Sequence, residues 1–130
     1  MEKCNEKIGL VLALISLSAD AQAAGCGAPK TAFDQVYCAG NLFTQTDHDL
    51  NLAYSSLRKH LNSASKESLK QGQLTWIKQR NDQCSKEDNT GFFINLNCAN
   101  TMTADRLAFL KERERECTST GCVDARMGGH

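Results

Sequence analysis

Six cysteines are the residues of this chain whose type and spacing point most directly to chemistry. They are Cys26, Cys38, Cys84, Cys98, Cys117 and Cys122. An even number of thiols behind a secretion signal is typical of a disulfide framework formed in an oxidising compartment. Six cysteines allow many pairings, and their spacing alone does not choose among them.

The other reactive side chains form no recognisable catalytic or metal-binding motif. There is no C-x-x-C pair of the thioredoxin type, no zinc-type spacing of His and Cys, and no serine in a G-x-S-x-G context. His48 lies between Asp47 and Asp49, but consecutive helix residues point in different directions, so we expect a solvated helix face. We therefore expect no catalytic residue, no metal and no cofactor. An enzyme that uses carboxylates outside any motif is the minor alternative.

Three charged residues occupy positions that should face a helical core. Asp47 shares its heptad position with Tyr54, and Arg80 follows Trp76 by one helical turn. Arg106 lies on the apolar face of a later helix. A buried charge without a partner costs several kcal/mol, so such groups are nearly always paired. We predict that Asp47 pairs with Arg80 or Arg106 as a structural ion pair that fixes the helix register.

The elements that must position these residues are helices. Apolar residues recur with helical periodicity, and no segment shows a convincing strand alternation. We expect an all-α fold, a small disulfide-stapled helical bundle of one short and three longer helices. The short helix should run from Pro29 to about Cys38 and stop at Gly40. Asn41 should cap the second helix, which should end near Asn62.

The third and fourth helices follow from similar signals. Ser63 or Ser65 should begin the third helix, which should run to about Cys84. Asn100 or Thr101 should cap the fourth. The apolar stripes of the longer helices predict a common core. The predicted core residues are Leu50, Tyr54, Leu57, Leu61, Leu69, Trp76, Ile77 and Leu110.

The first 23 residues resemble a secretory signal peptide. Lys3 and Lys7 give a basic start, and residues 8–19 are apolar but too short to cross a bilayer of roughly 30 Å as a helix. Ala21-Gln22-Ala23 is an A-x-A site, so we expect cleavage after Ala23. The expected domains are a signal peptide at 1–23, a helical domain at 24–122 and a flexible C-terminal tail at 123–130.

A lipoprotein is the less favoured interpretation of the same segment. Ala23-Ala24-Gly25-Cys26 resembles a lipoprotein box that would place lipid on Cys26. The box lacks the usual bulky aliphatic residue at Ala23, and lipidation would leave an odd number of thiols. We therefore expect a periplasmic or secreted protein.

Charge and hydropathy exclude two classes of partner. The leader carries two of the 15 basic and three of the 15 acidic residues, so the remaining chain has a net charge near +1. Phosphate binding needs a concentrated basic face, so we expect no nucleic acid. No apolar stretch beyond the leader is long enough to span a membrane. We expect a monomer.

Several short motifs follow one another in a fixed order behind the leader. They are Cys26; Cys38; Asp47-x-x-Leu50-Asn51-x-x-Tyr54-x-x-Leu57; Gln73-x-x-Trp76-Ile77-x-x-Arg80-x-x-x-Cys84; Cys98; and Thr103-x-x-Arg106-x-x-x-Leu110. In this order they resemble the N-terminal domain of the LprI-type lysozyme inhibitor family, over roughly Cys26 to Cys117. Many relatives have Arg-Asp after the tryptophan, whereas this chain has Arg80-Asn81 and places its acid at Asp82.

The resemblance implies a helical, disulfide-bonded periplasmic protein that binds and inhibits lysozyme. The alternative is an envelope module that binds another protein. The family pattern supports the disulfides Cys26–Cys38 and Cys84–Cys98, which leaves Cys117–Cys122 as the third pair.

The loop closed by Cys84 and Cys98 is the candidate partner-binding site. A lysozyme cleft is concave and holds two carboxylates, so a protruding, preorganised loop with donors and apolar shoulders suits it. The candidate residues are Lys86, Asn89, Thr90, Gly91, Phe92 and Phe93. The structural alternative is that at least one of the two phenylalanines folds back as a lid over the core.

Overall fold

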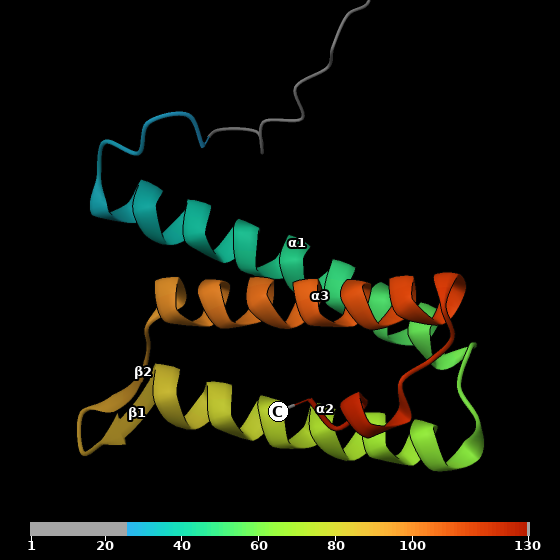
Figure 1. Cartoon of the computed structure of the whole chain (residues 1–130). Coiled ribbons are helices and arrows are strands. Elements are labelled where there is room, and N and C mark those ends of the chain that lie inside the picture. The colour runs from blue at the N-terminus through green and yellow to red at the C-terminus, as the bar shows by residue number, and fades with distance from the viewer. Residues whose placement is uncertain (1–25, 130) are drawn as a thin grey trace, which may run out of the picture.

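Three long helices and one β-hairpin form most of residues 26–129. A computed structural model describes residues 26–129. Its helices are α1 (Ala32–Arg58), α2 (Ser63–Cys84) and α3 (Leu96–Ser119). The α3 helix lies against α1, and α2 runs below α3 in Figure 1. The expectation of a mostly helical, disulfide-stapled fold is confirmed, but the number and lengths of the helices differ from the predicted set.

Two short elements complete the fold within the described residues. The strands β1 (Ser85–Asp88) and β2 (Gly91–Ile94) pair as an antiparallel hairpin that joins α2 to α3. A single 3-10 turn, η1 (Asp124–Arg126), follows α3. The prediction of no strand was wrong because each strand has only four residues, too few for an alternating pattern to be recognised in the sequence.

The helix α1 replaces the predicted short first helix and second helix. Thr31 accepts a hydrogen bond from the Asp34 amide at 3.0 Å, and the Asp34 carboxylate accepts one from the Thr31 amide at 3.2 Å. This capping box starts the helix at Ala32, three residues after Pro29, the predicted start. Gly40 does not end it, because a glycine inside a helix costs only about 1 kcal/mol and the chain continues in helical geometry.

Asparagines begin the other two helices. The Asn62 side chain accepts a hydrogen bond from the Ser65 amide at 2.8 Å, so Asn62 caps α2 and neither Ser63 nor Ser65 does. The Asn95 side chain accepts one from the Cys98 amide at 3.0 Å, so α3 begins before the predicted Asn100 or Thr101. Each side chain satisfies an amide that has no partner within its own helix.

One hydrophobic core lies where the three helices meet. Its centre is formed by Leu50, Leu57, Leu61, Leu69, Trp76 and Leu110, all of which are buried. Tyr54 and Ile77 pack against this centre and are partly buried. The core residues of α1 come from its C-terminal half, since its first buried residue is Leu50. The N-terminal half of α1 therefore extends beyond the core.

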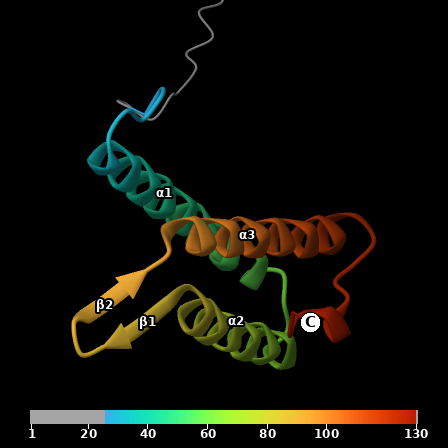
Figure 2. The ribbon, with the colours of Figure 1, turned by 90° about the vertical axis from the view of Figure 1, so that its left-hand side faces the viewer.

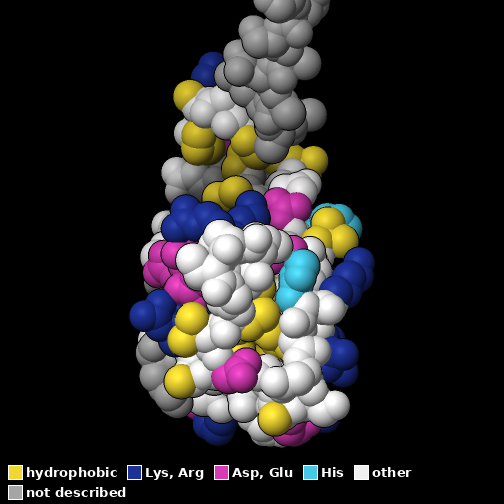
Figure 3. Space-filling view, turned by 45° about the vertical axis from the view of Figure 1, so that its right-hand side comes forward, with side chains coloured by type: hydrophobic (Ala, Val, Ile, Leu, Met, Phe, Trp, Pro, Cys, Tyr) yellow, Lys and Arg dark blue, Asp and Glu magenta, His cyan; other side chains and the backbone are white. Residues whose placement is uncertain are grey.

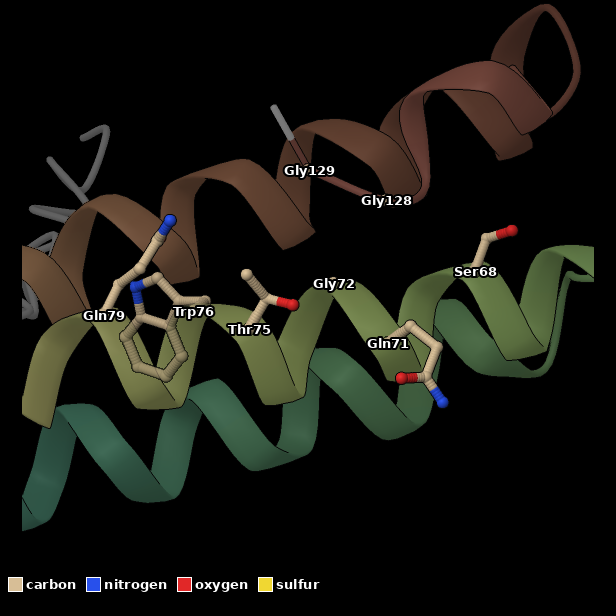
Figure 4. Close-up of a pocket in the computed structure, with 8 residues that line it drawn as sticks. All are labelled: Ser68, Gln71, Gly72, Thr75, Trp76, Gln79, Gly128 and Gly129. Carbon is tan, nitrogen blue, oxygen red and sulfur yellow. The ribbon is translucent and has the colours of Figure 1, made fainter.

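The C-terminal segment, which we expected to form a flexible tail, contributes a core residue. Met127 is fully buried and belongs to the same cluster as the helix residues. Asp124 accepts a hydrogen bond from the Ser65 hydroxyl at 2.6 Å. Gly128 passes so close to Gly72 that a Cβ on Gly72 would lie 2.1 Å from the Gly128 carbonyl oxygen. The absence of a side chain at Gly72 thus allows the segment to lie directly on α2 (Figure 4).

Three disulfides staple the described residues. They are Cys26–Cys38, Cys84–Cys98 and Cys117–Cys122. The first ties the segment before α1 to that helix, and the second joins the end of α2 to the start of α3. The third closes a short loop at the end of α3. These are the three pairs that the family pattern and the remaining cysteines suggested.

Asp47 and Arg80 approach each other at the edge of the core. The Asp47 Oδ1 atom lies 3.6 Å from Nη1 of Arg80, which is too long for a hydrogen bond but within range of an ion pair. The Asp47 side chain is partly exposed, so the pair is not fully internal. The guanidinium of Arg80 also stacks over the rings of Trp76 and Phe43, at 5.0 and 5.3 Å from their centroids.

Arg106 takes no part in that pair. Its Nε donates to the Gln73 side chain at 2.9 Å, and its guanidinium lies 4.5 Å from the centroid of the Phe109 ring. Burial lowers the pKa of Arg106 to about 10, and Tyr54 opposes this shift. The two inward-facing arginines therefore use different partners, and only Arg80 lies near Asp47.

The expected leader at 1–23 lies outside the described residues, as does His130. Cys26 is the first described residue, and its sulfur is bonded to Cys38. Within residues 26–129, no helix is both long and apolar enough to cross a membrane.

Candidate functional site

The hairpin projects from the end of the bundle where α2 finishes and α3 begins (Figures 1 and 2). The disulfide Cys84–Cys98 spans its base, and the Asn95 amide donates to the Cys84 carbonyl at 2.8 Å beyond the last strand pair. The hairpin is therefore held on both sides by long helices. A projection anchored in this way loses little conformational entropy when it binds a partner.

The tip of the hairpin is organised by Asp88. Its Oδ1 atom accepts hydrogen bonds from the Thr90 amide at 2.9 Å and from the Thr90 hydroxyl at 2.5 Å. These bonds favour the charged carboxylate and hold its pKa below the ordinary value of 3.8. Gly91 follows with φ of 145°, a backbone conformation that side chains disfavour. The exposed Asn89 occupies the turn between Asp88 and Thr90.

One face of the hairpin carries a cation on an aromatic ring. Lys86 and Phe93 are directly opposed in the strand register, so their side chains share this face. The Lys86 ammonium lies 4.9 Å from the centroid of the Phe93 ring. The same ammonium lies 3.5 Å from Oδ2 of Asp88. The Lys86 charge is thus held in place but stays exposed to solvent.

The other face of the hairpin carries two large apolar side chains, beside Ser85 and Glu87 of β1. Phe92 and Ile94 alternate along β2 and so point to the same side. Phe92 is 82% exposed and Ile94 is 67% exposed. Large apolar side chains that are exposed together on a small rigid element are typical of protein-binding sites.

The two phenylalanines do not form a lid over the core. Phe93 is 44% exposed, and neither it nor Phe92 belongs to the hydrophobic core cluster. The expectation that at least one of them folds back was wrong, because both lie exposed on a hairpin that projects from the bundle. Ile94 was absent from the predicted site. The strand register alone places Ile94 beside Phe92, and the sequence carries no signal of that register.

One pocket lies at the hairpin base and another lies along α2. The first, of about 360 Å³, is lined by Gln83, Cys84, Ser85, Lys86, Phe93, Ile94 and Asn95. The other, of about 280 Å³, lies along α2 under the C-terminal glycines (Figure 4). Its lining is Ser68, Gln71, Gly72, Thr75, Trp76, Gln79, Gly128 and Gly129. No carboxylate from residues 26–129 lines either pocket, so neither offers the paired acids of a glycosidase.

No metal centre is formed by the residues that the structure describes, since no three His, Cys, Asp or Glu side chains come together. His48 is exposed on the solvent face of α1, between its two acidic neighbours.

The fold and the site define a small disulfide-stapled helical protein whose hairpin projects and exposes large apolar side chains. The sequence model of the lysozyme inhibitor LprI family matches residues 26–110, which include all three helices in whole or in part and the hairpin. The chain belongs to this family. No curated protein and no solved structure matches the chain.

Proposed function

We propose that this protein is a non-enzymatic inhibitor of lysozyme that places its hairpin in the substrate cleft of the enzyme. Membership of the lysozyme inhibitor LprI family supports the partner. The observation that carries the mode of binding is the exposure of Phe92 and Ile94 on a hairpin fixed at its base by Cys84–Cys98.

The chemistry of the hairpin suits a glycosidase cleft. Such a cleft is shaped to bind a sugar chain and holds two carboxylates. Lys86 supplies a fixed cation on one face of the hairpin, and Phe92 supplies apolar area on the other. The exposed Asn89 and Thr90 add polar groups at the tip of the hairpin, which is the part that enters deepest into the cleft.

The disulfides support an oxidising compartment, which we propose is the periplasm or the extracellular space. The proposed route is a signal peptide cleaved after Ala23. The bond from Cys26 to Cys38 uses the sulfur that a lipoprotein would need for its lipid. Lipidation at Cys26 is therefore the weaker alternative.

An envelope module that binds a different protein is the second candidate function. It is favoured by the net charge of the chain, which is 0 over all 130 residues. A neutral protein gains no long-range attraction to a cationic lysozyme, so its association would be slow compared with that of an acidic inhibitor.

The test is the double variant Lys86→Ala/Phe92→Ala in a cell-wall turbidity assay with lysozymes of several classes. Loss of central contacts typically costs about 2 kcal/mol or more, so the inhibition constant should rise at least about 30-fold. The matched control is Lys70→Ala/Leu74→Ala, which removes an exposed lysine and an exposed apolar residue from α2. The control should inhibit as the parent protein does.

Two results would contradict the proposal. Unchanged potency of the hairpin variant would remove the hairpin from the binding site. Failure of the parent protein to inhibit any lysozyme, while a different envelope protein co-purifies with it, would favour the second candidate function.

A further inference from the structure

The first part of α1 forms an arm that extends past the bundle. The Asn100 side chain donates to the Ala39 carbonyl at 3.1 Å, so the first turns of α3 contact α1 close to this residue. Residues 32–38 of α1 continue beyond that contact (Figures 1 and 2). None of them is fully buried. We call residues 32–38 the α1 arm.

The α1 arm presents an apolar stripe to solvent. Phe33, Val36 and Tyr37 are spaced three and four residues apart, so they are neighbours on the helix surface. They are 79, 63 and 53% exposed. Figure 3 shows hydrophobic side chains gathered over this end of the molecule, whereas charges of both signs are interspersed over the helices below.

The α1 arm is as firmly held as the hairpin. The disulfide Cys26–Cys38 joins the last residue of the arm to the segment that precedes the helix. The capping box of Thr31 and Asp34 fixes the first turn of the arm. A helix this far from the core would otherwise fray at its end. Instead, the apolar stripe is presented on a preorganised element.

The α1 arm and the hairpin lie at the same end of the molecule. In both ribbon views they diverge from each other, with the start of α3 between them (Figures 1 and 2). Both carry large apolar side chains without cover from the described residues. A single partner that covers this end would meet both elements.

The exposed apolar areas of the α1 arm and of the hairpin together match the size of one protein–protein interface. At the measured exposures, the three apolar side chains of the α1 arm present about 400 Å². Phe92, Phe93 and Ile94 on the hairpin present roughly the same area. A stable protein–protein interface buries about 800 Å² on each partner. Either patch alone is about half of this area, and the two together reach it.

We propose that the α1 arm is a second contact element for the same protein that the hairpin binds. This inference rests on the proposed function, so the partner is lysozyme. The hairpin enters the cleft, and Phe33, Val36 and Tyr37 pack on an apolar surface beside it. A second copy of this chain is the less suitable occupant, because a dimer through the arm alone would bury only about half the area of a stable interface.

The test is the variant Phe33→Ala/Tyr37→Ala, measured in the same inhibition assay. Both side chains are exposed and alanine favours helix, so the fold should stay intact. The inhibition constant should rise at least about tenfold. The matched control is Leu42→Ala/Leu52→Ala, on other sides of the same helix and similarly exposed, which should stay within about threefold of the parent. Combined with Lys86→Ala/Phe92→Ala, the two fold-changes should multiply.

The possible failures are distinguishable. If the hairpin variant loses inhibition and the arm variant keeps it, the proposed function stands and the second contact is wrong. If the parent protein inhibits no lysozyme, the proposed function fails and the inference fails with it. If sedimentation shows a dimer of the parent that the arm variant abolishes, the α1 arm is a self-association surface and the inference is overturned.

Discussion

Arg80 and Arg106 place their guanidinium groups inside the molecule, chiefly against aromatic rings. Arg80 stacks over Trp76 and Phe43, and Arg106 stacks over Phe109. A guanidinium is weakly hydrated and planar, so a ring face compensates part of its desolvation. This arrangement explains why Arg106 is buried without an ion pair to a carboxylate of the described residues, and why the partly exposed Asp47 suffices for Arg80.

The Asp88 carboxylate stabilises the conformation of the hairpin tip by accepting hydrogen bonds from Thr90. Because Thr90 donates to the charged carboxylate, the folded pKa is lowered below 3.8. A lowered carboxyl pKa means that the tip is stabilised above pH 3.8 and loses this stabilisation as the pH falls through the lowered value. We expect the NMR signal of the Thr90 amide to titrate with a midpoint below 3.8.

The control for this titration is Asp88→Asn, which removes the ionisable group but keeps a side-chain acceptor. The Thr90 amide of this variant should show no titration in the same range. A midpoint at or above 3.8 in the parent protein would mean that the bond from Thr90 to Asp88 does not persist in solution.

The proposed function depends on the hairpin. The disulfide Cys84–Cys98 at its base should therefore contribute more to lysozyme binding than the other two disulfides of the described residues. Replacing Cys84 and Cys98 together by alanine opens a loop that the chain-entropy model values at roughly 3 kcal/mol. We expect urea unfolding to show a loss of that size. Inhibition of lysozyme should weaken as well, because the hairpin is no longer held at its base.

Replacing Cys117 and Cys122 by alanine is the matched comparison. This pair closes a shorter loop at the other end of α3, so stability should fall by roughly 2 kcal/mol. Inhibition should not change in folded protein. If both disulfide variants inhibit equally well, the hairpin needs no fixed base.

The helices were easier to foresee from the sequence than the hairpin. The core residues repeat every three or four positions over long segments, so Leu50, Leu57 and Leu69 were predictable from periodicity alone. Strands of four residues are too short for a recognisable alternation, and the shared face of Phe92 and Ile94 depends on the strand register. The candidate loop was therefore located correctly in the chain, but its shape and its apolar face were not.

The observed helix ends also differ from the predicted ones, because several residues compete to cap each helix. Asn62 and Asn95 each offer a short side-chain oxygen to a free amide, and Thr31 with Asp34 satisfies two donors at once. These local bonds outweigh the signals of Pro29 and Gly40. The predicted short helix already contained Phe33, Val36 and Tyr37, but its continuation through Gly40 as part of α1 was not foreseen.

At the scale of the whole molecule, the chain divides into a packed end and a projecting end. The core, the C-terminal segment and η1 occupy one end, where Leu61, Leu69 and Met127 meet. The α1 arm and the hairpin occupy the other (Figure 1). The large apolar side chains with the highest exposure, Phe33, Val36, Phe92 and Ile94, all lie at the projecting end, which is the distribution expected of a binding protein.

The packed end depends on the C-terminal segment, although its composition suggested a loose tail. Met127 is fully buried, so Met127→Ala should lower the free energy of unfolding by roughly 2–5 kcal/mol. Gly72→Ala should destabilise as well, because its Cβ would collide with the Gly128 backbone and displace the segment from α2. Val123→Ala, at an exposed position of the same segment, should stay within about 0.5 kcal/mol of the parent. Urea unfolding followed by circular dichroism measures all three, and equal stability of the Met127 and Val123 variants would show that the segment does not pack on the bundle.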